Sequence, residues 1–437
     1  MSIRNIIMLL AGISVIALME TTACTQIVAP ISKTPISSPA SSASTATPTS
    51  PQTTSGTVSR ELCRGGDRVI ILLVDTRLLN GISTGLEQFA SDLCKDGYTV
   101  IQRLSDFKNP SEVRSYLVQM YTQTKGQLAG AIAFGDLPHA YQLVTEKSTN
   151  PSIPSLTEET ISFQYYTDLN GTFGASPSYK SPGKHEYSYD THTGDLNWEI
   201  WFGLLPLYKG DISKTIESIN RYFSKNHAYR SGQSNISRGF IEINEHYKST
   251  STDQDAQYLS YLRAGTYAWL PFSKGNNAHL YFDTKTPGLG LNDGYQALTE
   301  GFADFTVQDA HGWYTSSGKL TVDLVENKPV STVFFWSNGC AVGNIDYPGN
   351  FLTSILYSAT SSVLVAKGTT NESGGMGNNI KGFFGANIAS AMSGHMSIGD
   401  AILSHINVPL VSPYSDNREF LFATTVILGD PTLKLCW

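Results

Sequence analysis

Charged side chains are scarce in this sequence of 437 residues, of which 15% are Asp, Glu, Lys or Arg. There are 30 basic and 37 acidic residues, so the net charge is −7 and the chain has no basic excess to bind a nucleic acid. Cysteine is also rare, with five residues, whereas Tyr (22) and Gly (38) are plentiful. This balance is typical of a folded extracellular protein with many turns and argues against a disordered chain.

The N-terminus lacks an apolar run long enough for a membrane-spanning helix. The run from Ile6 to Met19 has about fourteen residues, whereas a bilayer span needs roughly twenty. It predicts a signal peptide over residues 1–23 and a product outside the cytoplasm. Cys24 then stands at a place that resembles the bacterial lipoprotein processing site, which implies a lipid on Cys24. Thr21 replaces the apolar residue of that site, so secretion without a lipid is the alternative.

Residues 24–62 have the composition of a flexible, disordered tether. Between residues 30 and 59, 21 are Ser, Thr or Pro, and large apolar side chains are almost absent. Such a segment cannot bury enough apolar surface to offset the entropy lost on folding. It is expected to separate the N-terminal attachment from a folded body by up to roughly 100 Å when extended.

The remaining sequence alternates short buried strands with amphipathic helices, a pattern that predicts an α/β fold of mostly parallel sheets flanked by helices. Two consecutive subdomains are expected, over residues 63–232 and 233–437, each with its own open sheet. The expected strands are 69–75, 99–103, 130–134, 240–244, 304–309, 330–336 and 362–366, and the expected helices are 84–96, 111–125 and 255–262. Residues 150–200 are expected to form irregular connections.

Two expected strands end in residues that are suited to acyl transfer. The strand at 304–309 precedes His311 and Gly312, and the strand at 330–336 precedes Cys340. Functional residues of open α/β sheets collect beyond the carboxyl ends of strands, so imidazole and thiol are expected at one rim. The imidazole can promote the thiolate and protonate a leaving amine, and the amides of Gly312 and Cys340 can bind an oxyanion. Each residue alone also has an ordinary explanation, as a buried thiol or a His-Gly turn.

This pair of strand ends resembles the gingipain-type cysteine peptidases of the caspase-like clan. Four further segments are similar to motifs of that family, in the same order: Ile132-Ala-Phe-Gly-Asp-Leu-Pro138, Tyr165-Tyr-Thr-Asp-Leu-Asn-Gly171, Phe202-Gly-Leu-Leu-Pro206 and Leu428-Gly-Asp-Pro-Thr-Leu-Lys-Leu435. The resemblance implies a caspase-like fold and a cysteine endopeptidase with Cys340 as nucleophile and His311 as proton carrier. The segment 233–437 would then be the catalytic subdomain. Leu204 departs from the family, which commonly has Arg at that place.

The resemblance also implies candidates for the rest of the site. In the family an acid that orients the imidazole follows the first strand of the catalytic unit, and Glu245 stands there. Glu242 and Asp309 are nearby alternatives, and a solvated loop carboxylate is the other interpretation of Glu245. Asp253 and Asp255 lie where the family builds a wall of its specificity pocket, which implies cleavage after basic residues, although helix capping explains them as well. Trp313 and Trp336 flank the dyad and either line this pocket or belong to the core.

The other cysteines and a short acidic loop give two structural expectations. In an oxidising compartment, one pair among Cys63, Cys94 and Cys436 can form a disulfide, and the preferred pair is Cys63 with Cys94. Asp168 and Asn170 resemble half of a calcium loop, and relatives bind structural calcium. An Asx turn explains these two residues without a metal.

The expected protein is a monomer that acts on protein or peptide substrates without a cofactor and touches a membrane only through a lipid on Cys24. Two alternatives stay open. One is a catalytically silent cell-surface binding module with the same fold. The presence of both His311 and Cys340 argues against this alternative. The other is a cysteine transpeptidase of the sortase kind, which needs an Arg beside its Cys, whereas the only Arg after Cys340 is Arg418 in a polar loop.

Overall fold

The computed structural model describes residues 59–146, 156–176, 187–237, 239–252, 254, 278–301, 303–371, 388, 392, 395–407 and 422–435. The predicted signal peptide, Cys24 and nearly all of the predicted tether lie outside these residues. The first strand, β1 (Ser59–Arg64), begins inside the segment that was expected to be tether. None of the helices in the described residues has the length and apolar character that crossing a membrane requires.

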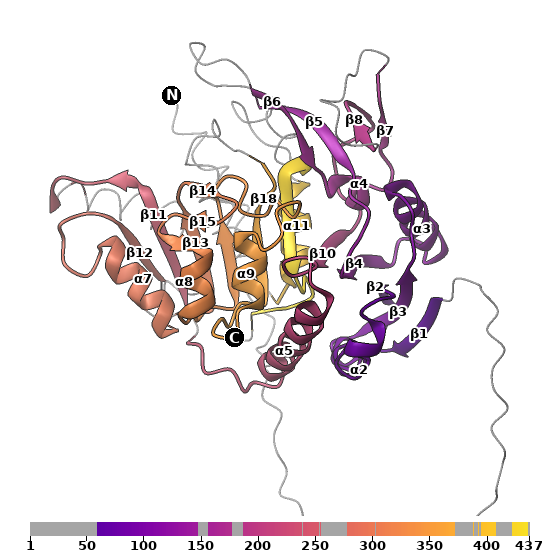
Figure 1. Cartoon of the computed structure of the whole chain (residues 1–437), viewed down its shortest axis with the longest axis horizontal. Coiled ribbons are helices and arrows are strands. Elements are labelled where there is room, and N and C mark those ends of the chain that lie inside the picture. Colours follow the sequence, from indigo (N-terminus) through magenta and orange to yellow (C-terminus); the bar gives the residue numbers. More distant parts are fainter. Residues whose placement is uncertain are drawn as a thin grey trace, which may run out of the picture. The chain divides into compact units, whose positions relative to one another are not determined.

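A single large sheet of eleven strands runs through the described residues (Figure 1). In spatial order its strands are β1, β3 (Tyr98–Ser105), β2 (Arg68–Asp75), β4 (Leu128–Phe134), β10 (Trp201–Leu205), β19 (Thr425–Gly429), β18 (Val365–Thr369), β17 (Phe334–Ser337), β13 (Phe305–Asp309), β11 (Phe240–Lys248) and β12 (Ala278–Asp283). Neighbours are parallel except for β1 with β3 and β18 with β19. The prediction of an α/β fold with a mostly parallel sheet is confirmed.

Residues of both expected subdomains contribute strands to this one sheet, which corrects the prediction of two consecutive sheets. The C-terminal strand β19 returns between the two halves, where it pairs in parallel with β10 through Leu204 and Leu428 and antiparallel with β18. Gly203 permits this junction, because a Cβ there would lie 2.6 Å from the carbonyl oxygen of Gly429. Leu204 is therefore buried at the junction of the halves.

Helices cover the sheet on both faces. They are α2 (Leu79–Lys95), α3 (Pro110–Gln123), α4 (Gln164–Thr167), α5 (Ile212–Arg230), α7 (Leu291–Glu300), α8 (Val322–Asn327), α9 (Phe351–Tyr357) and α11 (Ile398–Ile406). Helices α8, α9, α5 and α2 form a row in which each contacts the next (Figure 1). On β10, Trp201 contacts α11 at Gly399, whereas Phe202 points to the opposite face and stacks on Phe163 beside α4.

The helices predicted at 84–96 and 111–125 are confirmed as α2 and α3, and their starts follow from local chemistry. Asn109 caps α3, since its side-chain oxygen accepts from the amide of Glu112, and Pro110 occupies the first turn. Asp211 caps α5 in the same way through the amide of Lys214. The helix predicted at 255–262 lies outside the described residues.

Residues 150–200 contain short strands where irregular connections were expected. Strands β5 (Tyr141–Glu146), β6 (Leu156–Ile161) and β8 (Ser188–Tyr189) form one small sheet, and β7 (Thr172–Gly174) pairs with β9 (Thr191–Thr193) in another. Alternation over so few residues is too weak a signal to separate such strands from loops.

Aromatic rings fix the register of the strands that carry the candidate site. Phe240, Phe305 and Phe334 are buried and stack across β11, β13 and β17, with ring centroids 5.8 Å apart in both pairs. Because the three strands are parallel and paired at these residues, their carboxyl ends come out beside one another.

Cys63 and Cys94 form a disulfide, so the preferred pair predicted from the sequence is confirmed. The bond joins β1 to α2 with a Cα–Cα distance of 6.3 Å. Cys436, the other candidate partner, lies outside the described residues.

Candidate active site

The two candidate catalytic loops leave neighbouring strands at the same edge of the sheet. Strands β13 and β17 pair in parallel, with Gln308 opposite Ser337 at their carboxyl ends. The pairing continues for one more residue, because the amide of Asn338 donates to the carbonyl oxygen of Gln308 at 2.9 Å. The segments that contain His311 and Cys340 therefore start side by side.

These two segments touch through glycines. A Cβ on Gly312 would lie 2.6 Å from the Cα of Gly339 and 2.7 Å from the amide nitrogen of Cys340. Such contacts are too short for any residue other than glycine, so the two backbones approach as closely as possible here. His311 directly precedes Gly312, and Cys340 directly follows Gly339, so imidazole and thiol belong to one rim.

Both candidate catalytic side chains reach the surface. His311 is exposed, and Cys340 is half-buried and forms no disulfide. The next residue, Ala341, has a φ of 53°, a left-handed conformation that an alanine adopts only when its surroundings enforce it. Its amide donates to the carbonyl oxygen of Asn371, and the hydroxyl of Thr369 donates to that of Gly339 at 2.9 Å. Hydrogen bonds thus hold the backbone of the residue before Cys340 and of the residue after it.

Glu245 supports the loop that follows His311. Its carboxylate accepts hydrogen bonds from the hydroxyl of Tyr295 and from the amide of Lys319 at 3.1 Å. Burial and this carboxylate hold the pKa of Tyr295 well above its usual value, so the phenol stays protonated and donates. No hydrogen bond joins Glu245 to His311 in the described residues. The connection is indirect, because Gly318, beside Lys319, donates its amide to the carbonyl oxygen of His311 at 2.7 Å.

His246 is a neighbour of His311 that the sequence analysis missed. The two imidazole rings meet edge to face, with centroids 4.7 Å apart and an interplanar angle of 79°. His246 lies on β11, the strand next to β13, directly after Glu245. Its place at the carboxyl end of an adjacent parallel strand was the signal that could have identified it.

The predicted pocket residues have different surroundings. Asp253 and Asp255 lie outside the described residues. Trp313 is 47% exposed beside His311. Trp336 is only 4% exposed. Its indole nitrogen donates to the side chain of Asn338, and the ammonium of Lys367 lies 4.5 Å from the centroid of its ring. Trp336 is therefore a core residue and not an exposed pocket wall.

Two tyrosines extend the exposed surface of Trp313. The rings of Trp313 and Tyr314 have centroids 4.4 Å apart, and Tyr347 stacks on Tyr314 at 5.4 Å. Tyr347 is 43% exposed. Exposed aromatic surface of this kind is typical of a binding region. We call these three residues the aromatic patch; Tyr314 and Tyr347 were not predicted.

The residues predicted for calcium have protein partners. The carboxylate of Asp168 accepts from the amide of Gly171 at 2.6 Å and lies 2.8 Å from the Nε2 atom of His192. Asn170 donates from its side chain to Glu199 at 2.6 Å. In the part of the chain that the structure describes, no group of three or more His, Cys, Asp or Glu side chains is arranged to hold a metal ion. Calcium binding stays a prediction; a local turn accounts for Asp168, and the hydrogen bond to Glu199 accounts for Asn170.

The fold can be compared with known proteins. No protein-family model matches the chain, and no curated protein matches it in sequence. The crystal structure of the Arg-specific cysteine proteinase gingipain R is similar, with a TM-score of 0.56 and 12% identity over 84% of this chain and 78% of that one.

Two other solved structures are similar to the same extent. A complex of the pro- and mature domains of this proteinase from Porphyromonas gingivalis has a TM-score of 0.55 and 12% identity, over 84% of this chain and 79% of that one. A further protease structure has a TM-score of 0.55 and 12% identity over 86% and 79% of the two chains. The chain therefore has the fold of the gingipain cysteine proteinases, as the order of its sequence motifs implied.

Proposed function

We propose that this protein is an exported cysteine endopeptidase that hydrolyses peptide bonds with Cys340 and His311. The observation that carries the proposal is the contact of Gly312 with Gly339 and the amide of Cys340, which brings the two loops together at the carboxyl ends of β13 and β17. The accessibility of both side chains supports it, because a substrate has to reach the sulfur and the ring.

The proposed reaction follows from these groups. His311 accepts the thiol proton of Cys340, and the thiolate attacks the scissile carbonyl carbon, whose oxygen becomes an oxyanion near the amides of Gly312 and Cys340. His311 then gives the proton to the leaving amine, and an acyl-enzyme remains. Water, deprotonated by His311, attacks the acyl carbon, and the thiol and the free acid are restored. These steps need no cofactor.

Glu245 and His246 act in this proposal as positioning residues. Glu245 fixes the turn at residues 317–319 whose amide binds the carbonyl oxygen of His311. His246 limits the rotation of the His311 ring through their edge-to-face contact. Neither residue has to touch the substrate for these roles.

The aromatic patch is proposed to hold an apolar side chain of the substrate. Trp313 and Tyr347 are two of the three large apolar side chains that are exposed in the described residues, and Trp313 is separated from His311 by Gly312 alone. Such a surface gains free energy by covering an apolar side chain of a bound peptide. Cleavage after basic residues, with Asp253 and Asp255 as the selecting acids, remains part of the proposal.

Export is supported by the disulfide between Cys63 and Cys94, since such bonds persist in oxidising compartments. Together with the apolar N-terminal run and the Ser/Thr/Pro-rich tether, it favours a cell-envelope lipoprotein attached through Cys24, or a secreted protein.

The experiment that tests the proposal is cleavage of a peptide library by the mature protein and by its Cys340→Ala variant. We expect hydrolysis by the parent and none by the variant, with unchanged circular dichroism and Tm. Ser83→Ala, at an exposed position of α2, is the matched control and should remain active. Full activity of Cys340→Ala would contradict the proposal. Capture of an added amine in place of water would assign the protein to the transpeptidases, and no turnover would make it a binding module.

A further inference from the structure

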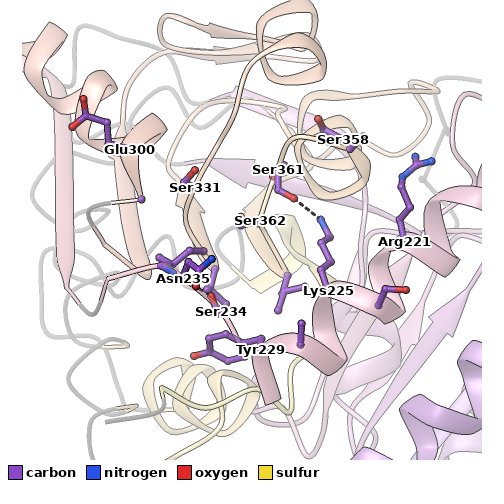
Figure 2. A pocket seen from close by; sticks show the side chains of 17 residues that line it. Arg221, Lys225, Tyr229, Ser234, Asn235, Glu300, Ser331, Ser358, Ser361 and Ser362 are labelled. Carbon is purple, nitrogen blue, oxygen red and sulfur yellow. Dashed lines mark hydrogen bonds between the residues drawn. The ribbon is translucent and has the colours of Figure 1, made fainter. Parts of the chain in front are cut away.

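A cavity lies at the opposite ends of the strands that carry the candidate active site. Its volume is about 680 Å³. Its wall includes Ser331, which precedes β17, and Ser362, which precedes β18, whereas the candidate catalytic loops follow the carboxyl ends of the strands. Helix α5 forms another side of the cavity (Figure 2). The cavity is therefore separate from the rim that holds His311 and Cys340.

The wall of this cavity combines two cations with several hydroxyl groups. Arg221 and Lys225 stand one helical turn apart on α5, and Ser331, Ser361 and Ser362 lie around them (Figure 2). Hydroxyl groups and cationic N–H groups are the donors that bind oxyanions.

The ammonium group of Lys225 has carbonyl partners but no carboxylate partner in the described residues. Nζ donates to the carbonyl oxygens of Leu356 at 2.7 Å and Ser361 at 3.1 Å, whereas an ammonium can donate three hydrogen bonds. Burial lowers the pKa of Lys225 to about 7, and the charge of Arg221 acts in the same direction. The protonated form is thus a desolvated cation without a counter-ion.

Arg221 is only partly neutralised. One of its terminal nitrogens pairs with Glu217, whose side chain is largely exposed, and the other donates to the carbonyl oxygen of Tyr357 at 3.3 Å. Its Nε atom is buried and has no hydrogen-bond partner in the described part of the chain.

The other titratable groups around Lys225 do not replace the missing anion. On α5 these are Tyr222, whose ring centroid is 5.9 Å from Nζ, and Tyr229. Glu300, at the end of α7, also lines the cavity, and its carboxylate accepts from the side chain of Gln296 at 2.7 Å. The lining residues that precede β17 and β18 are uncharged.

We propose that this cavity binds a small oxyanion, a carboxylate or a phosphate-type group, whose charge pairs with Lys225 and Arg221. The hydroxyls of Ser361 and Ser362 donate to its remaining oxygens, whereas the hydroxyl of Ser331 already donates to the carbonyl oxygen of Thr299. An anion in this place supplies the third acceptor of Lys225, the counter-charge that Lys225 lacks, and an acceptor for the buried Nε atom of Arg221. The site does not depend on the proposed peptidase chemistry.

The test is a titration of the mature protein with sulfate at constant ionic strength, followed by calorimetry and by Tm. Sulfate stands for the phosphate-type group because its charge does not change near neutral pH. A parallel titration with acetate tests the carboxylate class. We expect saturable binding of at least one of the two anions at about pH 6. Because the cation must be protonated, binding should be roughly tenfold weaker or worse at about pH 9.

Variants at Lys225 separate specific binding from a general salt effect. Lys225→Met should lose the saturable response, and Lys225→Arg, which stays charged, should keep it at both pH values. Lys214→Met is the matched control, because its side chain lies on the same helix and is 61% exposed; it should respond like the parent. Absence of saturable binding at about pH 6, or an equal response of Lys225→Met and the parent, would overturn the proposal. If Lys225→Met does not fold, anion binding by Lys225→Arg at about pH 9 decides. Loss of saturable binding by Lys225→Arg at that pH would contradict the proposal.

Discussion

At the scale of single residues, Gly312 has the most constrained place in the candidate site. Its Cα lies against Gly339. This close contact of the two backbones sets the distance between the neighbouring residues His311 and Cys340. A methyl group there would have to separate the two loops. Displacements of about 1 Å in a catalytic group can cost about 100-fold in rate.

We therefore expect Gly312→Ala to lower kcat/KM for peptide cleavage by roughly 100-fold while the protein stays folded. The measurement is steady-state hydrolysis together with Tm. Gly290→Ala is the control, since a Cβ there would meet only the side chain of Asp293, at 3.2 Å, and its activity should match the parent. Undiminished activity of Gly312→Ala would show that the close approach is not needed.

The sequence was sufficient to place His311 and Cys340 at one rim, because both follow apolar strands and the ends of parallel strands meet. The same argument could have placed His246, which stands at the carboxyl end of the neighbouring strand β11. It was not sufficient for Tyr347, because nothing in the local pattern distinguishes this residue from other loop tyrosines. The sequence left open whether Trp336 lines the pocket or belongs to the core, and its 4% exposure decides for the core.

At the scale of elements, α9 connects the candidate active site with the distal cavity. The amide of Phe351 at its start donates to the carbonyl oxygen of Tyr314 in the aromatic patch, at 2.7 Å. The carbonyl oxygen of Leu356 near its end accepts from the ammonium of Lys225 at 2.7 Å. A cation at this position compensates the negative end of the helix dipole, and its own desolvation opposes its charging.

The lowered pKa of Lys225 makes stability depend on pH. In the folded state the pKa is about 7 and in the unfolded state it returns to about 10.5, so between these values the unfolded chain binds more protons. The free energy of unfolding should therefore gain a contribution that rises with pH across this window, by at most about 1.4 kcal/mol per pH unit.

Urea unfolding in chloride buffer, at several pH values between about 7.5 and 9.5, measures this contribution. The difference between the parent and Lys225→Met should grow in favour of the parent as pH rises. The same comparison for Lys214→Met should give a constant difference. A constant difference for Lys225→Met as well would show that the folded pKa is not lowered.

The place of β19 is the element-scale feature that the sequence could not reveal. Its apolar residues predict a buried strand at most, whereas its insertion between β10 and β18 depends on pairing with segments far away in the chain. For the same reason, the merging of two expected sheets into one was not predictable from local patterns.

At the scale of the whole molecule, a buried ion pair connects the segment after β19 to α5. Arg230 and Asp430 form this pair, and the carboxylate of Asp430 also accepts from the side chain of Asn226 at 2.9 Å and from the amide of Thr432 at 3.0 Å. Asp430 directly follows β19, the strand that joins the two halves of the sheet. The segment Leu428 to Leu435, which resembles a motif of the family, thus connects the central strand β19 to α5.

Removing Arg230 leaves the buried carboxylate of Asp430 without its cation and also breaks the ion pair of Arg230 with Asp96. We expect Arg230→Met to lower the free energy of unfolding by about 3–5 kcal/mol, measured by urea unfolding. Arg64→Met removes a solvent-exposed pair with Glu61 and should leave stability unchanged. An equally small effect of both substitutions would mean that the ion pair does not fasten the junction.

The proposed peptidase activity depends on His311 acting on the sulfur of Cys340. The most direct measurement is the rate at which iodoacetamide alkylates Cys340 at about pH 6.5, followed by mass spectrometry of the peptide that contains it, in the parent and in His311→Ala. An imidazole that promotes the thiolate predicts a rate at least roughly tenfold higher in the parent. Equal rates in the two proteins would contradict the account.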